Sequence, residues 1–193
     1  MTITLVLGGA RSGKSAYAEQ LAVQSAAPVV YIATATAGDA EMAARIAHHR
    51  ARRPAAWRTV EAPLDLAGAL QLHAAANTSV LVDCLTLWLS NLLFDGAADY
   101  PGAGPINPAA QFTQSRDALL DTLPQLPGNI ILVSNEIGFG VTPMGAVSRF
   151  FVDEAGHLHQ RIAALAQQVR LIVAGCPVAV KGLTADELRM NRG

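Results

Sequence analysis

The sequence predicts an α/β fold, in which a mostly parallel sheet carries helices on both faces. Three observations support this prediction. Apolar runs of strand length recur along the chain, they lie between segments with helical periodicity, and their hydrophobicity is continuous rather than alternating. Continuous hydrophobicity is typical of strands that are covered on both faces, as in a parallel sheet between two helix layers.

The predicted elements alternate along the chain. Strands are predicted over 3–7, 29–33, 80–82, 130–133 and 169–174, and helices over 15–23, 40–51, 64–75, 85–94, 109–123 and 147–168. Asp39 is predicted to cap the second helix, and Pro54 to end it. Segment 95–108 is rich in Gly, Pro, Ala and Asn, and we expect a long loop there, either a mobile lid or a surface excursion.

Composition and charge favour a single soluble domain over residues 1–193. The net charge of −1 gives no reason to expect nucleic acid or an anionic membrane as the main partner. The two cysteines, Cys84 and Cys176, are too few for a disulfide scaffold or a zinc site, which favours the cytoplasm. We expect no leader peptide, because Gly8 and Gly9 interrupt the first apolar run, and no membrane span, because no apolar segment reaches the roughly 20 residues that a span requires.

The glycine-rich segment GGARSGKS follows the first predicted strand and precedes the first predicted helix. Its pattern, G-x-x-x-x-G-K-S, matches a P-loop, which holds phosphate on backbone N–H groups and on the N-terminal end of the next helix. Lys14 can contact the β and γ phosphates, and the Ser15 hydroxyl can bind Mg²⁺. A glycine-rich turn that binds nothing is the alternative. The expected phosphate-binding residues are Gly8, Gly9, Ala10, Arg11, Ser12, Gly13, Lys14 and Ser15.

Two acidic residues follow predicted strands. Asp83 comes directly after the run 80–82, at the sheet edge where α/β proteins bind ligands, so it is a second candidate Mg²⁺ ligand. Asp83 could instead only cap the helix that follows it. Glu136 follows the run 130–133 and could polarise a substrate hydroxyl or a water molecule, although this signal is weak when it stands alone.

The segment EMAARIAHHRARRP, residues 41–54, places two adjacent histidines among four arginines. On a helix, Arg45, His49 and Arg52 share one face, whereas His48 points about 100° away. Positive neighbours lower the pKa of a histidine, so a neutral imidazole here could attack phosphorus and form a covalent intermediate. Composition alone favours the alternative, which is an exposed basic helix with incidental histidines.

Several motifs together resemble the bifunctional adenosylcobinamide kinase/adenosylcobinamide-phosphate guanylyltransferase family of cobalamin biosynthesis. In chain order they are LGGARSGKS, YIATA, DAEMAARIAHHRARRPAAWRTVE, VLVDCLTLWLSNLLF, SNEIGFG and LIVAG, and they cover nearly the whole chain. The resemblance implies a RecA-like P-loop NTPase fold and two Mg²⁺-dependent reactions. These are phosphorylation of adenosylcobinamide by ATP or GTP, and transfer of GMP from GTP to the resulting phosphate, which gives adenosyl-GDP-cobinamide.

The resemblance also implies roles for individual residues. The family pattern R-I-x-x-H-(R or K)-x-x-R-P matches Arg45, Ile46, His49, Arg50, Arg53 and Pro54. His49 is therefore the expected guanylylated nucleophile, and His48 falls on a variable position. The expected guanine-nucleotide residues are Ala33, Thr34, Ala35, Arg50, Ala51, Arg52, Arg53, Glu61 and Asp83. A carboxylate can accept hydrogen bonds from guanine or from a ribose hydroxyl, and which acid does which is left open.

The same resemblance implies a homotrimer with active sites between subunits, and it exposes two departures. Met144 and Gly145 stand where many relatives have an acid and an asparagine, and His159 stands where asparagine is common. If these positions contact the corrinoid, the acceptor preference could differ. Residues 182–193 extend past the usual end of the family and form a C-terminal tail with no assigned role.

Two other functions are left open by the residues alone. A P-loop kinase for another small metabolite would use His49 only to bind phosphate, and it would form no covalent nucleotide. A RecA-like nucleotide switch would instead bind a protein or nucleic-acid partner. The balanced charge argues against the nucleic-acid version, because phosphate contacts call for a basic surface.

Overall fold

The computed structural model describes residues 1–36, 40, 44, 47, 50–51, 53–96 and 99–183. Within these residues, seven strands form one sheet in the order β3-β2-β4-β5-β1-β6-β7. The strands are β1 (Thr2–Gly8), β2 (Val29–Ala33), β3 (Arg58–Glu61), β4 (Ser79–Asp83), β5 (Asn129–Asn135), β6 (Gln168–Val173) and β7 (Cys176–Lys181). Every neighbouring pair is parallel except β6–β7. The predicted α/β fold with a mostly parallel sheet is confirmed.

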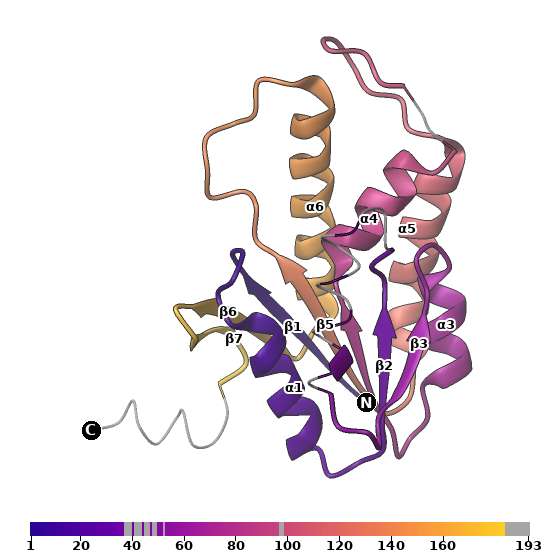
Figure 1. The fold of residues 1–193 in the computed structure, drawn as a ribbon, viewed down its shortest axis with the longest axis vertical. Coiled ribbons are helices and arrows are strands. Elements are labelled where there is room, and N and C mark those ends of the chain that lie inside the picture. Colours follow the sequence, from indigo (N-terminus) through magenta and orange to yellow (C-terminus); the bar gives the residue numbers. More distant parts are fainter. Residues whose placement is uncertain are drawn as a thin grey trace.

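Helices cover both faces of this sheet (Figure 1). They are α1 (Lys14–Gln24), α3 (Leu66–His73), α4 (Leu85–Phe94), α5 (Ala110–Thr122), the 3-10 turn η1 (Leu123–Gln125) and α6 (Ala146–Leu165). Alternate strand residues supply two cores: Leu5 and Leu132 face α3, α4, α5 and α6, whereas Val6 and Ile131 face α1. The central strands are therefore buried on both sides, as their continuous hydrophobicity predicts.

The five predicted strands and the five predicted helices that the structure describes in full lie close to the expected residues, and the residues of α4 agree at both ends. α3 begins later than expected, at Leu66, because the Asp65 carboxylate accepts a hydrogen bond from the Gly68 N–H at 2.8 Å and caps it. α6 ends three residues early, because Ala166 is extended and the Gln167 N–H already donates to the Ile3 carbonyl.

The predicted helix over 40–51 is described only in part. Ala40, Ala44, Ala47, Arg50 and Ala51 are helical and exposed, and Pro54 is not helical. The remaining residues of that prediction, with the proposed cap Asp39, lie outside the described residues. The predicted loop carries no helix or strand over 95–96 and 99–108, and the Tyr100 hydroxyl fastens it to α4 by donating to the Leu93 carbonyl at 2.7 Å.

The sequence patterns missed two strands, β3 and β7, which form the two edges of the sheet. An edge strand has a neighbour on one side only, and much of its length faces water. In β7, Val178 and Val180 are 49% and 63% exposed, and in β3 Arg58 is exposed. β3 lacks the continuous apolar run by which the inner strands were predicted, whereas β7 contains the short apolar run 178–180, which lies outside the predicted strands.

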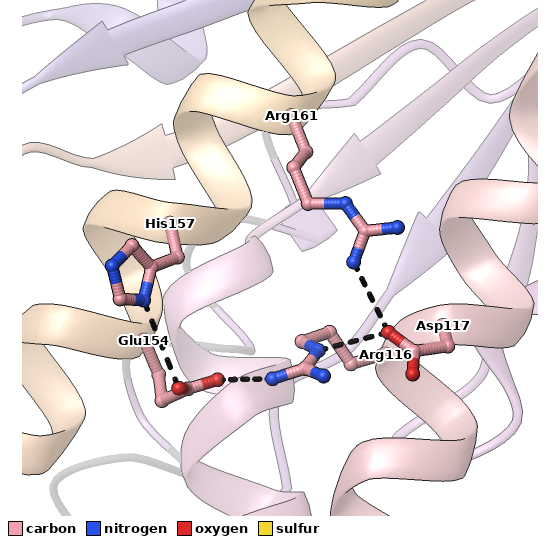
Figure 2. A network of polar contacts seen from close by, with 5 residues as sticks. All are labelled: Arg116, Asp117, Glu154, His157 and Arg161. Carbon is pink, nitrogen blue, oxygen red and sulfur yellow. Dashed lines mark hydrogen bonds and ion pairs between the residues drawn. The ribbon is translucent and has the colours of Figure 1, made fainter.

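A set of ion pairs joins α5 to α6 (Figure 2). Arg116 binds Glu154 at 2.6 Å and Asp117 at 3.1 Å, while Arg161 binds Asp117 at 3.2 Å. His157 lies 3.9 Å from Glu154. We call these five residues the α5–α6 ion-pair network. Within the described residues, no helix combines the length and apolar character needed to cross a membrane.

Candidate nucleotide-binding site

The segment 8–15 forms a tight loop between β1 and α1, as a P-loop requires. Arg11 and Gly13 have left-handed backbone conformations, with φ of 56° and 96°, and the Ser12 N–H donates to the Gly9 carbonyl at 3.2 Å. Gly13 precedes the first residue of α1, so the positive end of that helix opens into the loop. Lys14 lies over the loop, where its Nζ donates to the Gly9 carbonyl at 3.3 Å.

The turn between β6 and β7 packs against this loop. The Gly175 N–H donates to the Ser12 carbonyl at 2.8 Å. A Cβ on Gly13 would lie 3.2 Å from the Gly175 Cα, and a Cβ on Gly8 would lie 2.4 Å from the Ser12 Oγ and 2.8 Å from the Ile172 carbonyl. Both loop glycines are therefore required by close backbone approach, at Gly13 together with its positive φ.

Asp83 ends β4 at the same edge of the sheet as the loop. Strand β5 lies between β4 and β1, so one strand separates Asp83 from the loop. Its carboxylate Oδ2 accepts a hydrogen bond from the Tyr31 hydroxyl at 3.0 Å. The cap of α4 is Cys84, without a side-chain hydrogen bond, so the alternative that Asp83 only caps this helix is not supported.

Tyr31 and Arg53 connect Asp83 to the predicted guanine-nucleotide segment. The Arg53 guanidinium lies 3.4 Å from the centroid of the Tyr31 ring, in cation–π contact, and Trp57 stacks beside that ring at 6.5 Å. Burial and the neighbouring Asp83 carboxylate raise the pKa of Tyr31, so its hydroxyl stays protonated and donates to Asp83. Sequence reasoning missed Tyr31. Its position two residues before Ala33, on the same strand face, was the signal that could have found it.

Three of the predicted nucleotide-binding residues form one row across the sheet. Ala33 at the end of β2 pairs with Glu61 on β3 and with Asp83 on β4. The next residue, Thr34, is fully buried, and its hydroxyl donates to the Cys84 carbonyl at 2.8 Å. Thr34 thus fastens two strand ends together, whereas Glu61 is exposed at the edge of the sheet.

The end of β5 lies beside the loop. Asn135 pairs with Gly8, and the backbone N–H of Glu136 donates to the Gly8 carbonyl at 3.0 Å. The Asn135 amide donates to the Thr86 hydroxyl at 2.8 Å, and Cys84 Sγ lies 3.0 Å from the same hydroxyl. Burial raises the pKa of the Cys84 thiol. Neither Cys84 nor Cys176 forms a disulfide in the described structure.

The predicted nucleophile His49 lies outside the described residues, as do Arg45, Ile46, His48 and Arg52. Arg50 and Ala51 are described and exposed. The role assigned to His49 therefore stays a prediction.

The donors at this edge suit Mg²⁺. Ser15 and Asp83 offer hydroxyl and carboxylate oxygens, which are hard ligands. Among the described residues, no group of three or more His, Cys, Asp or Glu residues could hold a metal ion. At nucleotide sites Mg²⁺ usually binds through one or two protein oxygens together with the phosphates of the substrate.

A cavity also lies between two of the helices. It has a volume of about 210 Å³ and lies between the start of α3 and α5, where Gln111, Gln114 and Ser115 line it. The acid in its wall, Asp65, is already engaged as the cap of α3. None of the predicted nucleotide-binding residues that the structure describes lines this cavity.

Comparison with known proteins shows which family combines these features. The family model described as cobinamide kinase / cobinamide phosphate guanyltransferase, CobU, matches residues 4–180. The chain belongs to this family. It is 56% identical over 178 residues to the bifunctional adenosylcobalamin biosynthesis protein CobP of Pseudomonas aeruginosa. This alignment covers 92% of this chain and 96% of the relative. It is 41% identical over 179 residues to the bifunctional CobU protein of Escherichia coli K12. That alignment covers 92% of this chain and 98% of the relative.

The fold of this CobU family member is also similar to solved ATPases. The assembled ATPase EscN of the enteropathogenic Escherichia coli type III secretion system matches with a TM-score of 0.52 and 12% identity. A prototypical ATPase of the type III secretion system of pathogenic bacteria matches at 0.51 and 10%. Both matches cover 97% of this chain, which spans 50% and 60% of those longer proteins. At these identities the likeness concerns the fold alone, and it confirms the expected RecA-like P-loop NTPase fold.

The two departures from the family pattern lie in different surroundings. Met144, in the loop before α6, is 93% exposed. His159 is 7% exposed, and its Nε2 lies 2.7 Å from the Ser134 hydroxyl inside the protein. An effect of His159 on the acceptor would therefore have to act through a neighbouring side chain.

Proposed function

We propose that this chain phosphorylates adenosylcobinamide with ATP or GTP and then transfers GMP from GTP to adenosylcobinamide phosphate, giving adenosyl-GDP-cobinamide. The observation that carries the proposal is the match of residues 4–180, P-loop included, to a family described by both reactions. Relatives that span nearly the same length are described as bifunctional.

In the kinase step, the loop 8–15 holds the triphosphate. Its inward backbone N–H groups and the N-terminal end of α1 bind phosphate oxygens, and Lys14 adds a positive charge at the β and γ phosphates. Ser15 and Asp83 would hold Mg²⁺, which when bound neutralises the charge on the transferring phosphoryl group. Tyr31 orients Asp83 by donating to Oδ2, so Oδ1 is the oxygen that would face the metal.

In the guanylyl step, His49 attacks the α-phosphorus of GTP, so that an N–P bond forms and pyrophosphate leaves. A phosphate oxygen of adenosylcobinamide phosphate then attacks the same phosphorus and frees the imidazole. The proposed partners of the guanine nucleotide are Ala33, Thr34, Ala35, Arg50, Ala51, Arg52, Arg53, Glu61 and Asp83. The cation–π contact between Arg53 and Tyr31 supports this assignment, because it brings the arginine segment beside the strand that carries Asp83.

We further propose a homotrimer in the cytoplasm, with each active site completed by a neighbouring subunit. Support comes from the helical residues Ala40, Ala44, Ala47, Arg50 and Ala51, all of which are exposed. A segment that carries a nucleophile and lies on the surface of one subunit needs a further surface to close the site around the nucleotide. Sedimentation of the wild-type protein measures its oligomeric state.

The decisive experiment is labelling with GTP that carries ³²P at the α-phosphate. We expect acid-labile, alkali-stable label on the wild-type protein and on His48→Ala, but none on His49→Ala. Adding adenosylcobinamide phosphate should move the label to the corrinoid. Label retained on His49→Ala would contradict the assigned nucleophile, and phosphorylation of a corrinoid without any covalent nucleotide would indicate an ordinary P-loop kinase.

A second experiment tests whether both reactions share one loop. Lys14→Ala removes the cation at the β and γ phosphates, so we expect both corrinoid phosphorylation and self-guanylylation to weaken by on the order of 100-fold or more. Full kinase activity in this variant would contradict the role assigned to the loop.

A further inference from the structure

A carboxylate, an imidazole and a hydroxyl meet where β5 ends against α6. The residues are Glu136, His159 and Ser134, and we call them the edge cluster. His159 Nε2 lies 2.7 Å from Ser134 Oγ, and His159 Nδ1 lies 3.9 Å from Glu136 Oε2. The Glu136 Oε1 accepts a hydrogen bond from the Gly138 N–H at 2.6 Å. Three side chains from two elements therefore connect the core to the sheet edge.

The hydrogen bond to Ser134 determines where the proton of His159 lies. Ser134 is fully buried, and a buried hydroxyl needs an acceptor for its proton. When the Ser134 hydroxyl donates to His159 Nε2, the neutral ring carries its proton on Nδ1, the nitrogen that lies 3.9 Å from Glu136 Oε2. Burial lowers the pKa of His159, although the Glu136 carboxylate opposes the shift, so the imidazole stays neutral. The Gly138 N–H is thus hydrogen-bonded to this carboxylate, whereas the His159 ring packs beside it at 3.9 Å, beyond hydrogen-bond distance.

Glu136 is also attached to the phosphate-binding loop. Its backbone N–H donates to the carbonyl of Gly8, the first residue of the loop, at 3.0 Å. β5 lies between β1 and β4, so Glu136 follows the strand that separates the loop from Asp83. The Glu136 side chain is 17% exposed, which leaves part of the carboxylate open at the edge. Glu61, in contrast, is on β3, beyond β2 and β4.

We propose that Glu136 is the catalytic base of the kinase step, and that His159 and Ser134 hold its carboxylate in position. This inference rests on the proposed function. The hydroxyl oxygen of the acceptor forms a bond to the γ-phosphorus, the bond from that phosphorus to the β–γ bridging oxygen breaks, and the nucleoside diphosphate leaves. The hydroxyl proton passes to Glu136, which later releases it to water. A carboxylate that accepts a hydroxyl proton is an established arrangement in phosphoryl transfer.

The loop after Glu136 provides a surface suited to a bulky acceptor. Phe139, Val141 and Met144 are 81%, 96% and 93% exposed. Figure 1 shows their loop, between β5 and α6, standing clear of the sheet. A small cavity of about 70 Å³ lies against it, lined by residues that include Ile137 and Arg149. A ligand with an apolar body and a hydroxyl arm could rest on this loop and direct the arm toward Glu136.

The test compares the two reactions in Glu136→Gln, which keeps the size of the side chain but removes its basicity. We expect kcat for corrinoid phosphorylation to fall about 100-fold or more. KM for the nucleotide, self-guanylylation with GTP, and GMP transfer to supplied adenosylcobinamide phosphate should stay within about threefold of wild type, because none of them needs a hydroxyl proton removed. Glu154→Gln is the matched control: its side chain is 14% exposed but lies in the α5–α6 ion-pair network, so kinase activity should be retained.

The outcomes separate this inference from the proposed function. If the wild type phosphorylates adenosylcobinamide and Glu136→Gln does so within threefold of it, the base is not Glu136. If the wild type phosphorylates no corrinoid, the proposed function fails and this inference fails with it. Equal loss of kinase and guanylyl transfer in Glu136→Gln would show damage to the shared loop and would also overturn the assignment.

His159 is tested as a positioning residue with two variants. His159→Leu removes both ring nitrogens, and we expect kcat of the kinase step to fall on the order of 10- to 100-fold while KM for the nucleotide is unchanged. His159→Asn keeps an N–H donor and should recover most of this loss. If Asn restores nothing, or if His159→Leu lowers self-guanylylation equally, the role of His159 is structural and not positional.

Discussion

Two polar regions of this protein involve the same helix, α6, and they differ in charge and exposure. The α5–α6 ion-pair network consists of alternating charges, with side chains of Asp117 and Arg161 that are 43% and 53% exposed (Figure 2). The edge cluster contains one carboxylate, a neutral imidazole that is 8% exposed, and a fully buried hydroxyl. Water screens the Asp117–Arg161 pair of the first region, whereas it is nearly excluded from the imidazole and the hydroxyl of the second.

This difference determines what each region contributes. Exposed ion pairs gain little, because water and salt screen them and ordering long side chains opposes them. Buried polar groups are expensive when unpaired, so their geometry is strongly determined. We therefore assign to the ion-pair network a modest role in joining two helices, and to the edge cluster the positioning of Glu136 beside the phosphate-binding loop.

The largest effect on stability is expected from His159→Leu, which leaves the Ser134 hydroxyl buried without an acceptor. An unpaired buried polar group costs about 2 kcal/mol, so the free energy of unfolding of this variant should fall by that amount. Urea denaturation of the variant and of the wild type measures the difference. The double variant Ser134→Ala, His159→Leu removes both partners and should recover part of the loss. Equal stability of His159→Leu and wild type would contradict the assigned hydrogen bond.

A smaller effect is expected from Glu154→Ala in the ion-pair network. Glu154 and Arg116 are 14% and 20% exposed, so their bond is the least screened of the network. Its loss should lower the free energy of unfolding by about 1 kcal/mol in the same urea experiment. A loss as large as that in His159→Leu would remove the distinction between the two regions.

The two regions should lose their contributions to the free energy of unfolding at different pH values. Burial lowers the folded-state pKa of His159 below its ordinary 6.5, so the unfolded chain binds more protons there. The stability from His159 is present above about pH 6.5 and is lost as the pH falls from that value through the folded pKa. His73 shifts in the same direction, so the difference between wild type and His159→Asn isolates His159.

Asp117 in the network should respond only in stronger acid. Its hydrogen bond from Arg116 lowers its folded pKa below the ordinary 3.8. Its contribution is present above about pH 3.8 and is lost as the pH falls through the lower folded value. Urea denaturation of wild type and Asp117→Asn across this range measures it. A decline beginning near neutral pH in that difference would contradict the assignment.

The smallest effect is expected from Arg161→Ala. This side chain is 53% exposed and binds Asp117, which Arg116 already neutralises. We expect a loss of no more than about 0.5 kcal/mol, falling toward zero at high salt because exposed charges are screened. A loss that persists at 1 M salt would indicate packing of the arginine stem rather than charge.

Sequence reasoning located the elements that are buried on both faces and missed those at the edges. The inner strands are continuous apolar runs because helices cover them on two sides, and Gly8, Gly13 and Lys14 follow the first of these strands closely enough to form a local pattern. β3 is half exposed and shows no such run, whereas β7 is mostly exposed and has only the short run 178–180. Local patterns therefore identify a feature only when its cause is also local.

The partners of the site residues lie far apart in the sequence. Tyr31 reaches Asp83 across 52 positions, and His159 reaches Ser134 across 25. Gly175 approaches Gly13 because the turn between β6 and β7 folds behind the loop. None of these pairs has a spacing that periodicity or a motif could indicate, since each arises from strand order.

The amino-acid sequence by itself determined the α/β class, the phosphate-binding loop and the acid at the end of β4, because apolar runs and glycine spacing are local properties of the chain. The tertiary structure alone decided which groups surround them. Tyr31 donates a hydrogen bond to Asp83, the Gly175 N–H donates to the loop carbonyl of Ser12, and His159 packs beside Glu136. The physical reason is that a parallel sheet brings distant strand ends to one edge, where burial rather than sequence spacing selects the partner of each polar group.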